Sequence, residues 1–197
     1  LKDTNLLLRI LKNFKPDYII DFASICMVNE SWLNPTLYFK TNVISKAKIL
    51  NYLSKNKVLK KYIYISTPEV FGSSKKYMNE NEKKFNPSTP YATSKLSTEK
   101  LLKNFSQFHA LPLIICRFSN FYGPGQPLHR LIPKVIACID NKRKFPIQGE
   151  GKSRRNFIYS DDFCKGIFKV IKKGKTGNTY HFSGNKFYSV LQIIKII

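Results

Sequence analysis

The sequence lacks any apolar run near the ~18 residues that a helix needs to cross a bilayer. Its longer apolar segments, such as residues 111–116, have only the length of a strand and are interrupted by Pro112. An initiating methionine and a signal-peptide pattern are also missing. The last residues, SVLQIIKII, stop inside a helical apolar pattern. We therefore expect a fragment of a longer protein, with a cytoplasmic location and no membrane partner.

Cysteine and metal-ligand motifs are scarce as well. No C-x-x-C occurs, and the histidines lack the spacing of a metal site, so we predict that no metal is bound. Most of the cysteines stand in apolar contexts, and we expect buried thiols in a reducing compartment. The cysteines are Cys26, Cys116, Cys138 and Cys164, and the histidines are His109, His129 and His181.

Acidic residues are few, because 12 Asp and Glu face 34 Lys and Arg, for a formal net charge of +22. A charge of this size is compatible with a polyanion partner such as nucleic acid. The basic residues are mostly scattered lysines, however, and no basic stripe with interleaved aromatics and no zinc-finger or RNA-recognition signature occurs. We therefore favour a solvated, lysine-rich surface and do not expect nucleic acid as a partner. The positive charge also suits a diphosphate ligand.

The first 118 residues have a regular alternation of helical and strand patterns. Asn34 and Pro35 suit the N-cap and the first position of a long helix. The order α-β-α-β-α-β predicts right-handed crossovers and a parallel sheet, and therefore the α/β class. Helical patterns cover residues 4–14, 34–55 and 91–108, and strand patterns lie within residues 15–24, 61–66 and 111–118.

The pattern changes after Asn120 to short, mixed elements. These elements predict a smaller lobe, and we place a domain boundary near residue 121. We expect a loop at 120–127, helices at 129–142 and 160–173, a short strand and turn at 144–151, an extended segment at 154–159 and a strand at 178–184.

The stretch PYATSK places Tyr91 and Lys95 four residues apart, on one face of a predicted helix. An ammonium beside a phenol stabilises the phenolate and lowers the tyrosine pKa toward the range that a general base needs. Such pairs also arise by chance in a sequence with 11 tyrosines, so a surface pair is the ordinary interpretation. The polar strand end at Ser66 and Thr67 favours a site, because open α/β sheets bind ligands beyond the carboxyl ends of their strands. Thr67 would then hydrogen-bond the oxygen that Tyr91 deprotonates.

Polar residues that suit a diphosphate occur further along the chain. Arg117 and Arg155 carry guanidinium groups, whose planar fork engages two oxygens at once. Asn120 follows Arg117 by three residues. The sequence therefore predicts a diphosphate contact from this region.

Several motifs in one order resemble the extended short-chain dehydrogenase/reductases that modify nucleotide sugars, the NAD-dependent epimerase/dehydratase family. The likeness extends over nearly the whole chain and is greatest to the dTDP-glucose 4,6-dehydratases. It implies a Rossmann-like, doubly wound parallel sheet, truncated at its N-terminal part, with residues 1–120 as a partial dinucleotide-binding domain. Residues 121–197 would be a small mixed α/β substrate lobe, interleaved with late Rossmann elements and truncated at its C-terminus. The motifs are KPDYIIDFAS, NPTLYFKTNV, STPEVFG, PSTPYATSK, RFSNFYGPGQ, HRLIPKVI and GEGKSRRNFIYSDD.

Carried over residue by residue, the resemblance implies four catalytic residues. Tyr91 would take the proton from the sugar 4-hydroxyl, and Lys95 would lower the tyrosine pKa and bind the nicotinamide ribose. Thr67 would hydrogen-bond the reacting oxygen. Glu69 matches the base that removes the C5 proton, although a loop carboxylate without a role is an equally good interpretation of its position.

The resemblance also implies the ligands and the residues that bind them. NAD is the expected cofactor, with Ser24, Asn42 and Ser66 beside Tyr91 and Lys95 at its site. The expected partner is a nucleotide-diphosphate sugar, and a homodimer is the assembly that family members often adopt. The expected substrate ligands are Asn120, Arg155 and, as a weaker candidate, Arg130.

Departures from the family pattern leave the reaction open. Pro68 stands where the dehydratases carry an aspartic acid that protonates the departing 6-hydroxyl, and proline cannot transfer a proton. Phe121 replaces a common asparagine, and Asn156 replaces a common aspartate. The glycine-rich fingerprint and the acidic residue that reads the ribose are absent, so we expect weak NAD binding by this chain.

Three functions therefore remain open at this point. The first is an NAD-dependent lyase that removes water from a nucleotide hexose. The second is a nucleotide-sugar 4-epimerase or a related sugar modifier, which needs no acid at position 68. The third is a basic, non-catalytic binding protein on a degenerate scaffold.

Overall fold

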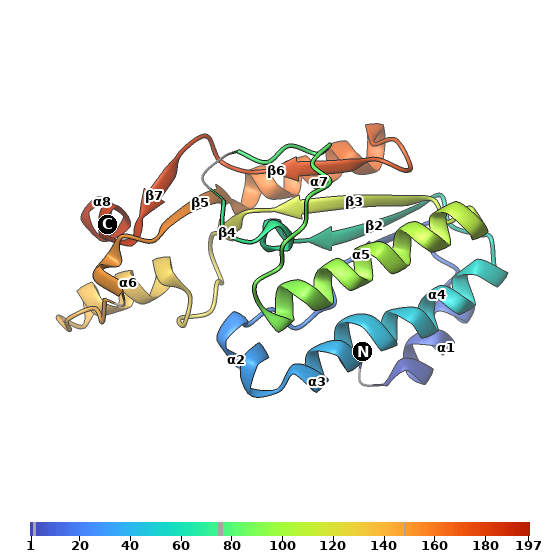
Figure 1. Cartoon of the computed structure of the whole chain (residues 1–197), viewed down its shortest axis with the longest axis horizontal. Helices are drawn as coiled ribbons and strands as arrows, with labels where there is room; N and C mark the ends of the chain where they lie inside the picture. The colour runs from blue at the N-terminus through green and yellow to red at the C-terminus, as the bar shows by residue number, and fades with distance from the viewer. Residues whose placement is uncertain (2, 75–76, 148) are drawn as a thin grey trace. The chain divides into compact units, whose positions relative to one another are not determined.

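The computed structural model describes residue 1 and residues 3–74, 77–147 and 149–197. The chain forms two compact units (Figure 1). The first unit consists of residues 1–117 and 170–181, and the second of residues 118–169 and 182–197. No described helix is long and apolar enough to span a membrane.

The first unit is built on a four-stranded sheet in the order β1-β2-β3-β6. Strands β1, β2 and β3 run parallel to one another, so the predicted parallel sheet is confirmed. Helices α1 (Thr4–Phe14), α4 (Ser45–Lys55) and α5 (Pro90–His109) lie beside this sheet (Figure 1). The strands are β1 (Tyr18–Asp21), β2 (Lys61–Ser66), β3 (Leu113–Phe118) and β6 (Thr179–Phe182).

Both faces of the central strands are buried, as a doubly wound sheet requires. Toward α1, α4 and α5, Tyr62 and Tyr64 of β2 pack with alternate residues of β3 and with helix residues such as Leu50. On the opposite face, Ile63 and Ile114 are fully buried. The end of helix α7 (Ser160–Lys173) is fixed there, because the Lys61 ammonium donates to the carbonyl oxygens of its residues 170 and 171, at 3.2 and 2.5 Å.

The helix expected at 34–55 begins as predicted, at Asn34. Its side chain accepts a hydrogen bond from the Leu37 amide, and Pro35 occupies the first turn. The helix is not regular throughout, because the π-helical segment η1 (Lys40–Ile44) separates α3 (Pro35–Phe39) from α4. π-Bulges inside α-helices are frequent at functional sites. The short helix α2 (Val28–Leu33) precedes this segment and was not predicted.

The second unit has a three-stranded mixed sheet in the order β4-β5-β7. Strand β5 (Arg154–Tyr159) pairs in parallel with β4 (Asn120–Tyr122) and antiparallel with β7 (Phe187–Ser189). Helices α6 (Leu131–Asp140) and α8 (Val190–Ile196) belong to this unit.

Three sequence-based expectations outside the first sheet need correction. Residues 120–127 are not all loop, because their start pairs with β5 as strand β4. The strand expected within 144–151 is not formed by its described residues, which leave out Gln148, and Gly149–Gly151 form the 3-10 turn η3. Thiol burial was also overestimated, because Cys26 and Cys164 are exposed and Cys138 is half-buried, whereas Cys116 is buried.

Candidate active site

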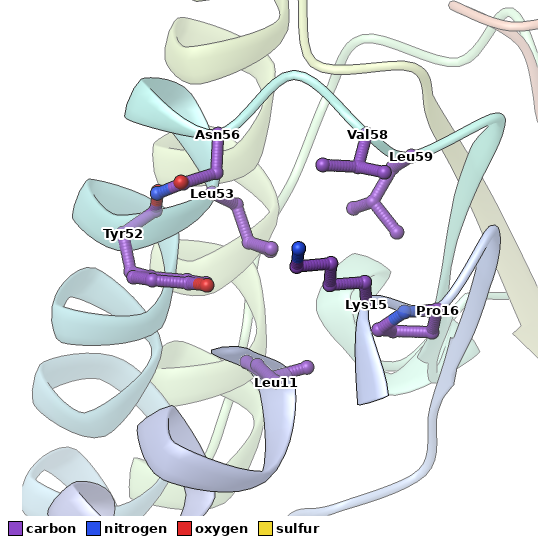
Figure 2. Close-up of a pocket in the computed structure, with 8 residues that line it drawn as sticks. All are labelled: Leu11, Lys15, Pro16, Tyr52, Leu53, Asn56, Val58 and Leu59. Atoms are coloured by element: carbon purple, nitrogen blue, oxygen red, sulfur yellow. The ribbon is translucent and has the colours of Figure 1, made fainter. Parts of the chain in front are cut away.

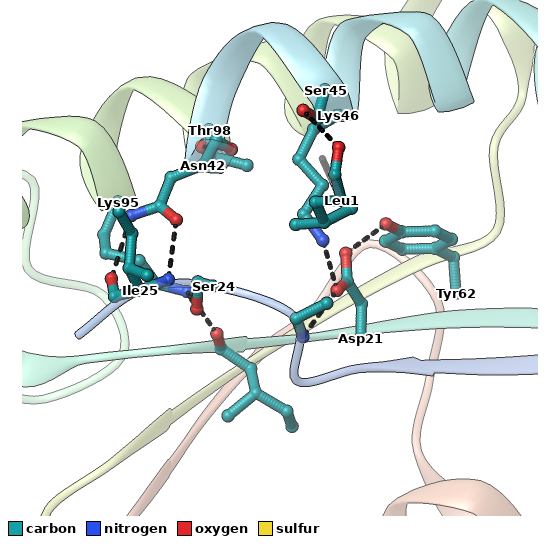
Figure 3. Close-up of polar contacts among 12 residues, drawn as sticks. Leu1, Asp21, Ser24, Ile25, Asn42, Ser45, Lys46, Tyr62, Lys95 and Thr98 are labelled. Atoms are coloured by element: carbon teal, nitrogen blue, oxygen red, sulfur yellow. Dashed lines mark hydrogen bonds and ion pairs between the residues drawn. The ribbon is translucent and has the colours of Figure 1, made fainter. Parts of the chain in front are cut away.

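Lys95 joins helix α5 to the carboxyl ends of two parallel strands. Its side chain is 2% exposed. The ammonium donates to the Ile65 carbonyl oxygen, near the end of β2, at 2.7 Å. It also donates to the hydroxyl of Ser24, just after β1, at 3.1 Å (Figure 3). One buried cation therefore lies where an open α/β sheet binds its ligands.

The surroundings of Lys95 bring its pKa close to neutrality. Burial lowers the pKa of the ammonium from 10.5 to about 7, against the opposing charge of the Asp21 carboxylate. The ammonium also lies 4.2 Å from the centre of the Tyr64 ring, an arrangement that stabilises the cation through the electron-rich face. Near pH 7 the charge on Lys95 is therefore set by small changes in its neighbours.

Tyr91 lies one turn before Lys95, on the same face of α5. The helix begins with the Thr89 hydroxyl accepting a hydrogen bond from the Ala92 amide at 3.1 Å, and with Pro90 in its first turn. The Tyr91 ring is largely buried and meets the Tyr38 ring edge-on, with centroids 6.4 Å apart. Packing and a fixed helix start therefore hold Tyr91 in place.

The strand end at Ser66 and Thr67 presents two hydroxyls. The Thr67 oxygen accepts a hydrogen bond from the Glu69 amide at 3.2 Å and so caps the 3-10 helix η2 (Pro68–Phe71). The hydroxyl proton of Thr67 is not used in that bond and can be donated elsewhere. The Ser66 hydroxyl is buried and has no hydrogen-bond partner among the described residues, as is also the case for the hydroxyls of Tyr64 and Ser119. A ligand or an ordered water would supply the missing partner.

Gly72 fixes the exit from η2. Its φ of +69° is in the left-handed region, and a Cβ added there would lie 2.2 Å from the Asn86 carbonyl oxygen. The Asn86 amide also donates to the Val70 carbonyl oxygen at 3.1 Å. Close backbone approach therefore requires glycine directly after the strand end that carries Thr67 and Glu69.

Asn42 is fully buried within η1 and acts as a brace. Its Oδ1 accepts from the Ile25 amide at 3.0 Å, and its Nδ2 donates to the Ile25 carbonyl oxygen at 3.1 Å. The same Nδ2 donates to the Ser94 hydroxyl at 3.0 Å. Since both amide atoms are bonded within the chain, Asn42 holds the loop that carries Ser24 against helix α5 (Figure 3).

Arg117, expected as a diphosphate ligand, lies instead in a buried ion pair. Its guanidinium forms two hydrogen bonds to Glu99, at 2.9 and 2.5 Å, and both side chains are at most 2% exposed. The stacked rings of Phe71 and Phe85 lie beside it, with centroids 4.8 and 5.1 Å from its central carbon. This planar, stacked and bidentate arrangement uses the groups that a diphosphate would need, so the expectation for Arg117 is wrong.

The expected substrate ligands all belong to the second unit. Asn120 is exposed at the start of β4 and donates to the Asn156 carbonyl oxygen at 3.3 Å. Arg155 is exposed on the neighbouring strand β5, and Arg130 directly precedes α6. Asn156 itself is buried and bonded through both amide atoms to residues 184 and 186. Of the predicted residues, Asn120 and Arg155 share one small sheet.

Sequence reasoning missed a cluster formed by Asp21, Lys46 and Tyr62. The Asp21 carboxylate forms a buried ion pair with Lys46 and accepts a hydrogen bond from the Tyr62 hydroxyl at 2.5 Å (Figure 3). The available signal was an aspartate at the end of the apolar run YIID, where an apolar residue is expected.

A small cavity in the first unit lies at the other end of the strands (Figure 2). Its volume is about 50 Å³, enough for very few water molecules. Pro16 and Leu59 line it, and they precede the starts of β1 and β2. It is therefore not part of the group around Lys95. The described residues contain no cluster of three or more side chains able to hold a metal ion.

The chain resembles known proteins over nearly its whole length. The model of the NAD dependent epimerase/dehydratase family matches residues 1–182. The chain is 34% identical to a dTDP-D-glucose 4,6-dehydratase from Dictyostelium discoideum, covering 99% of this chain and 47% of that protein. In general it spans about half the length of the curated relatives it matches.

Solved structures also resemble this chain in fold. DesIV, a dTDP-glucose 4,6-dehydratase from Streptomyces venezuelae solved with NAD and TYD bound, superimposes with a TM-score of 0.90 at 28% identity, over 98% of this chain and 59% of that one. A UDP-glucuronic acid 4-epimerase from Bacillus cereus has a TM-score of 0.88 at 28% identity, over 96% and 60%. The chain belongs to the NAD dependent epimerase/dehydratase family.

Proposed function

We propose that the chain is part of an NAD-dependent enzyme that oxidises a nucleotide-diphosphate hexose at C4, with dehydration of dTDP-glucose as its reaction. The observation that carries this proposal is the buried Lys95 ammonium, bonded at the carboxyl ends of β1 and β2 and one turn from Tyr91. The names of the relatives and structural neighbours support the substrate class and the cofactor.

Tyr91 is the proposed base for the 4-hydroxyl proton. A free tyrosine has a pKa near 10 and is a poor base at neutral pH. A cationic neighbour on the same helix face favours the phenolate and makes proton removal possible. Thr67, whose hydroxyl proton is available, would donate a hydrogen bond to the oxygen that loses its proton. Lys95 thus acts electrostatically, and Thr67 acts by orientation.

NAD fits the polar groups at this strand end. The Ser66 hydroxyl is buried without a partner among the described residues, and the Lys95 ammonium and the Ser24 hydroxyl lie at the same edge of the sheet. These three groups would hold the nicotinamide ribose, while Asn42 braces the loop from behind. When bound, NAD supplies the acceptor for the hydride that leaves C4.

The second unit would supply the nucleotide contacts. Asn120, Arg130 and Arg155 are the proposed ligands for the substrate diphosphate, since amide and guanidinium donors suit phosphate oxygens. Under this proposal the cofactor part covers residues 1–120 and ends at Asn120. The substrate part covers residues 121–197 and is interleaved with late elements of the first sheet, such as β6. A homodimer, as the family resemblance implies, and a cytoplasmic location complete the proposal.

A 4-epimerase is the second candidate, and Pro68 is the observation that favours it. Elimination of water requires a group that protonates the departing 6-hydroxyl, and proline at the start of η2 has no proton to give. Inversion at C4 needs only removal and return of hydrogen at that carbon. Glu69, the proposed C5 base, would have no step to perform in that case.

Product analysis separates these two candidates. The full-length protein would be incubated with NAD and dTDP-glucose. A 4-keto-6-deoxy sugar, seen by its ultraviolet absorbance in alkali, is expected for the dehydratase, and a C4-inverted hexose, seen by NMR, for the epimerase. Incubation with UDP-hexoses would extend the test. Absence of both products from every nucleotide hexose tried would overturn the proposal.

A further inference from the structure

Strand β1 ends in a buried acid. Asp21 follows three residues of the apolar run YIID and is 7% exposed. Its carboxylate is fully engaged, because it pairs with Lys46 of α4 and accepts hydrogen bonds from the Tyr62 hydroxyl and the Ala23 amide, at 2.5 and 3.1 Å. Lys46 is 1% exposed. Two opposite charges are thus enclosed together in the first unit.

Stability alone does not account for this ion pair. Removing two charges from water costs several kcal/mol per ion, and the replacement of buried pairs by apolar side chains of similar volume is often neutral or stabilising. Lys46 is followed on α4 by the buried residues Ile49 and Leu50, so a leucine or methionine at position 46 would extend an apolar face that already exists. An effect of the ion pair on a neighbouring charged group would explain why the pair is present.

Lys95 is the charged group beside the cluster. In the register of the sheet, Asp21 is paired with Tyr64, and the Lys95 ammonium lies 4.2 Å from the centre of that Tyr64 ring. Adjacent strands are only about 4.8 Å apart. Asp21 therefore lies on the strand next to the one that carries the ring beside the ammonium.

The backbone also connects Asp21 to Lys95. Asp21 holds the Ala23 amide, and Asn42 holds the amide and carbonyl of Ile25, so both ends of the intervening loop are fixed. Ser24 lies between these anchors, and its hydroxyl accepts from Lys95 at 3.1 Å. A shift of Asp21 would therefore displace the Ser24 hydroxyl relative to the ammonium.

We propose that Asp21 and Lys46 are positioning residues for Lys95. Asp21 holds the loop that presents Ser24 to the ammonium, and the buried ion pair sets the electric field in which that ammonium keeps its proton. Asp21 favours the charged form of Lys95, and Lys46 opposes it. The consequence for catalysis rests on the proposed function, whereas the effect on Lys95 does not.

Other charged or titratable groups also face Lys95. Glu99 of α5 and Cys26 of the loop after β1 favour the ammonium, and Lys46 is the cation that opposes it. Since Glu99 is already bonded to Arg117 through both oxygens, its negative charge is largely compensated. Asp21 and Lys46 are therefore the pair whose alteration should act on Lys95 in opposite directions.

The test is an NMR titration of the chain labelled with 13C-lysine. The Lys95 Cε signal is assigned by its loss in Lys95→Met, and it is followed in Asp21→Asn and Lys46→Met. We expect the Lys95 pKa to fall in Asp21→Asn and to rise in Lys46→Met, each by about one pH unit. Asp17→Asn and Lys60→Met are matched controls, because they alter an Asp–Lys pair that is exposed.

A merely structural role predicts a different outcome. Both substitutions disturb the same buried cluster, so damage to packing would shift the titration of Lys95 in one common direction or leave it unchanged. Either result overturns the proposal. If Asp21→Asn does not fold by circular dichroism, Lys46→Met and Lys46→Gln decide, since a rise supports the proposal and no rise refutes it.

Activity measurements keep this proposal separate from the proposed function. In an active enzyme, the alkaline limb of the kcat/KM pH profile should move with the Lys95 titration in each variant, because Lys95 supports the Tyr91 phenolate only in its charged form. Opposite NMR shifts without any sugar-modifying activity would leave the positioning role standing and reject the function. Sugar-modifying activity together with an unchanged Lys95 titration would support the proposed function and refute the positioning role.

Discussion

Lys95→Met should reduce the rise in stability with pH that the native chain shows above neutrality. The folded pKa of Lys95 is about 7, against 10.5 in the absence of burial. Between these two values the unfolded chain binds more protons than the folded chain. The free energy of unfolding therefore increases with pH in this window, and the cost of burying the ammonium is largest below pH 7.

The size of the effect follows from the two pKa values. A difference of one bound proton changes the free energy of unfolding by about 1.36 kcal/mol per pH unit. The difference for Lys95 is about half a proton at pH 7 and nearly one proton by pH 8. From pH 7 to pH 9, Lys95 should therefore raise the free energy of unfolding by about 2 kcal/mol.

Urea unfolding at several pH values, followed by circular dichroism, measures this slope. Lys46, whose pKa is also lowered by burial, contributes a slope of the same sign and is present in both proteins, so the comparison isolates Lys95. Lys48→Met, at an exposed position of α4, is the control and should keep the native slope. If the free energy of unfolding rose with pH equally in the native chain and in Lys95→Met, the lowered pKa of the buried Lys95 ammonium would be refuted.

Two further substitutions test the supports of the site. Glu99→Gln should lower the free energy of unfolding by about 3 kcal/mol in urea titrations, because it leaves the buried Arg117 guanidinium without a counter-charge; a loss below about 1 kcal/mol would contradict that assignment. Gly72→Ala should cost more than about 1 kcal/mol, since its φ is +69° and its Cβ would meet the Asn86 carbonyl. An unchanged thermal midpoint would show that the turn has room, and Gly177→Ala, with open space around it, is the matched control.

Local patterns were enough to predict most of the first unit. Strand β2 was expected at 61–66 and has those bounds, because a β-branched and aromatic run is closed by a polar end. Helix α5 was expected from residue 91 and begins at Pro90, after the Thr89 cap. Asn34 was predicted as a cap and is one. These features depend on residues at most four positions apart, so they can be recognised in the sequence alone.

Features that depend on distant partners were not predicted. Asp21 and Lys46 are 25 residues apart, and no local pattern joins them. Arg117 was expected to meet a ligand, but it pairs with Glu99, 18 residues earlier on another element. Strand β4 has only three residues and exists through its pairing with β5. In each case the partner comes from a distant part of the chain, so only the tertiary structure shows which group a residue contacts.

One proposed step involves Tyr91, Lys95 and Thr67, namely the removal of a proton from a sugar hydroxyl at this strand end. Pro68 bears on what happens afterwards, because it affects elimination and not oxidation at C4. A non-catalytic basic protein on the same scaffold would behave differently. Its affinity for polyanions would fall steeply with salt, and it would be indifferent to Tyr91.

The most direct test is therefore a single-turnover measurement of NADH formation by Tyr91→Phe in the full-length protein, with NAD and dTDP-glucose. The native protein should produce NADH absorbance, and the loss of the phenolic proton acceptor should slow it by about 10²- to 10⁴-fold. The variant should remain folded, since the ring packing against Tyr38 is kept, and circular dichroism checks this. NADH formation at the native rate in Tyr91→Phe would contradict the account.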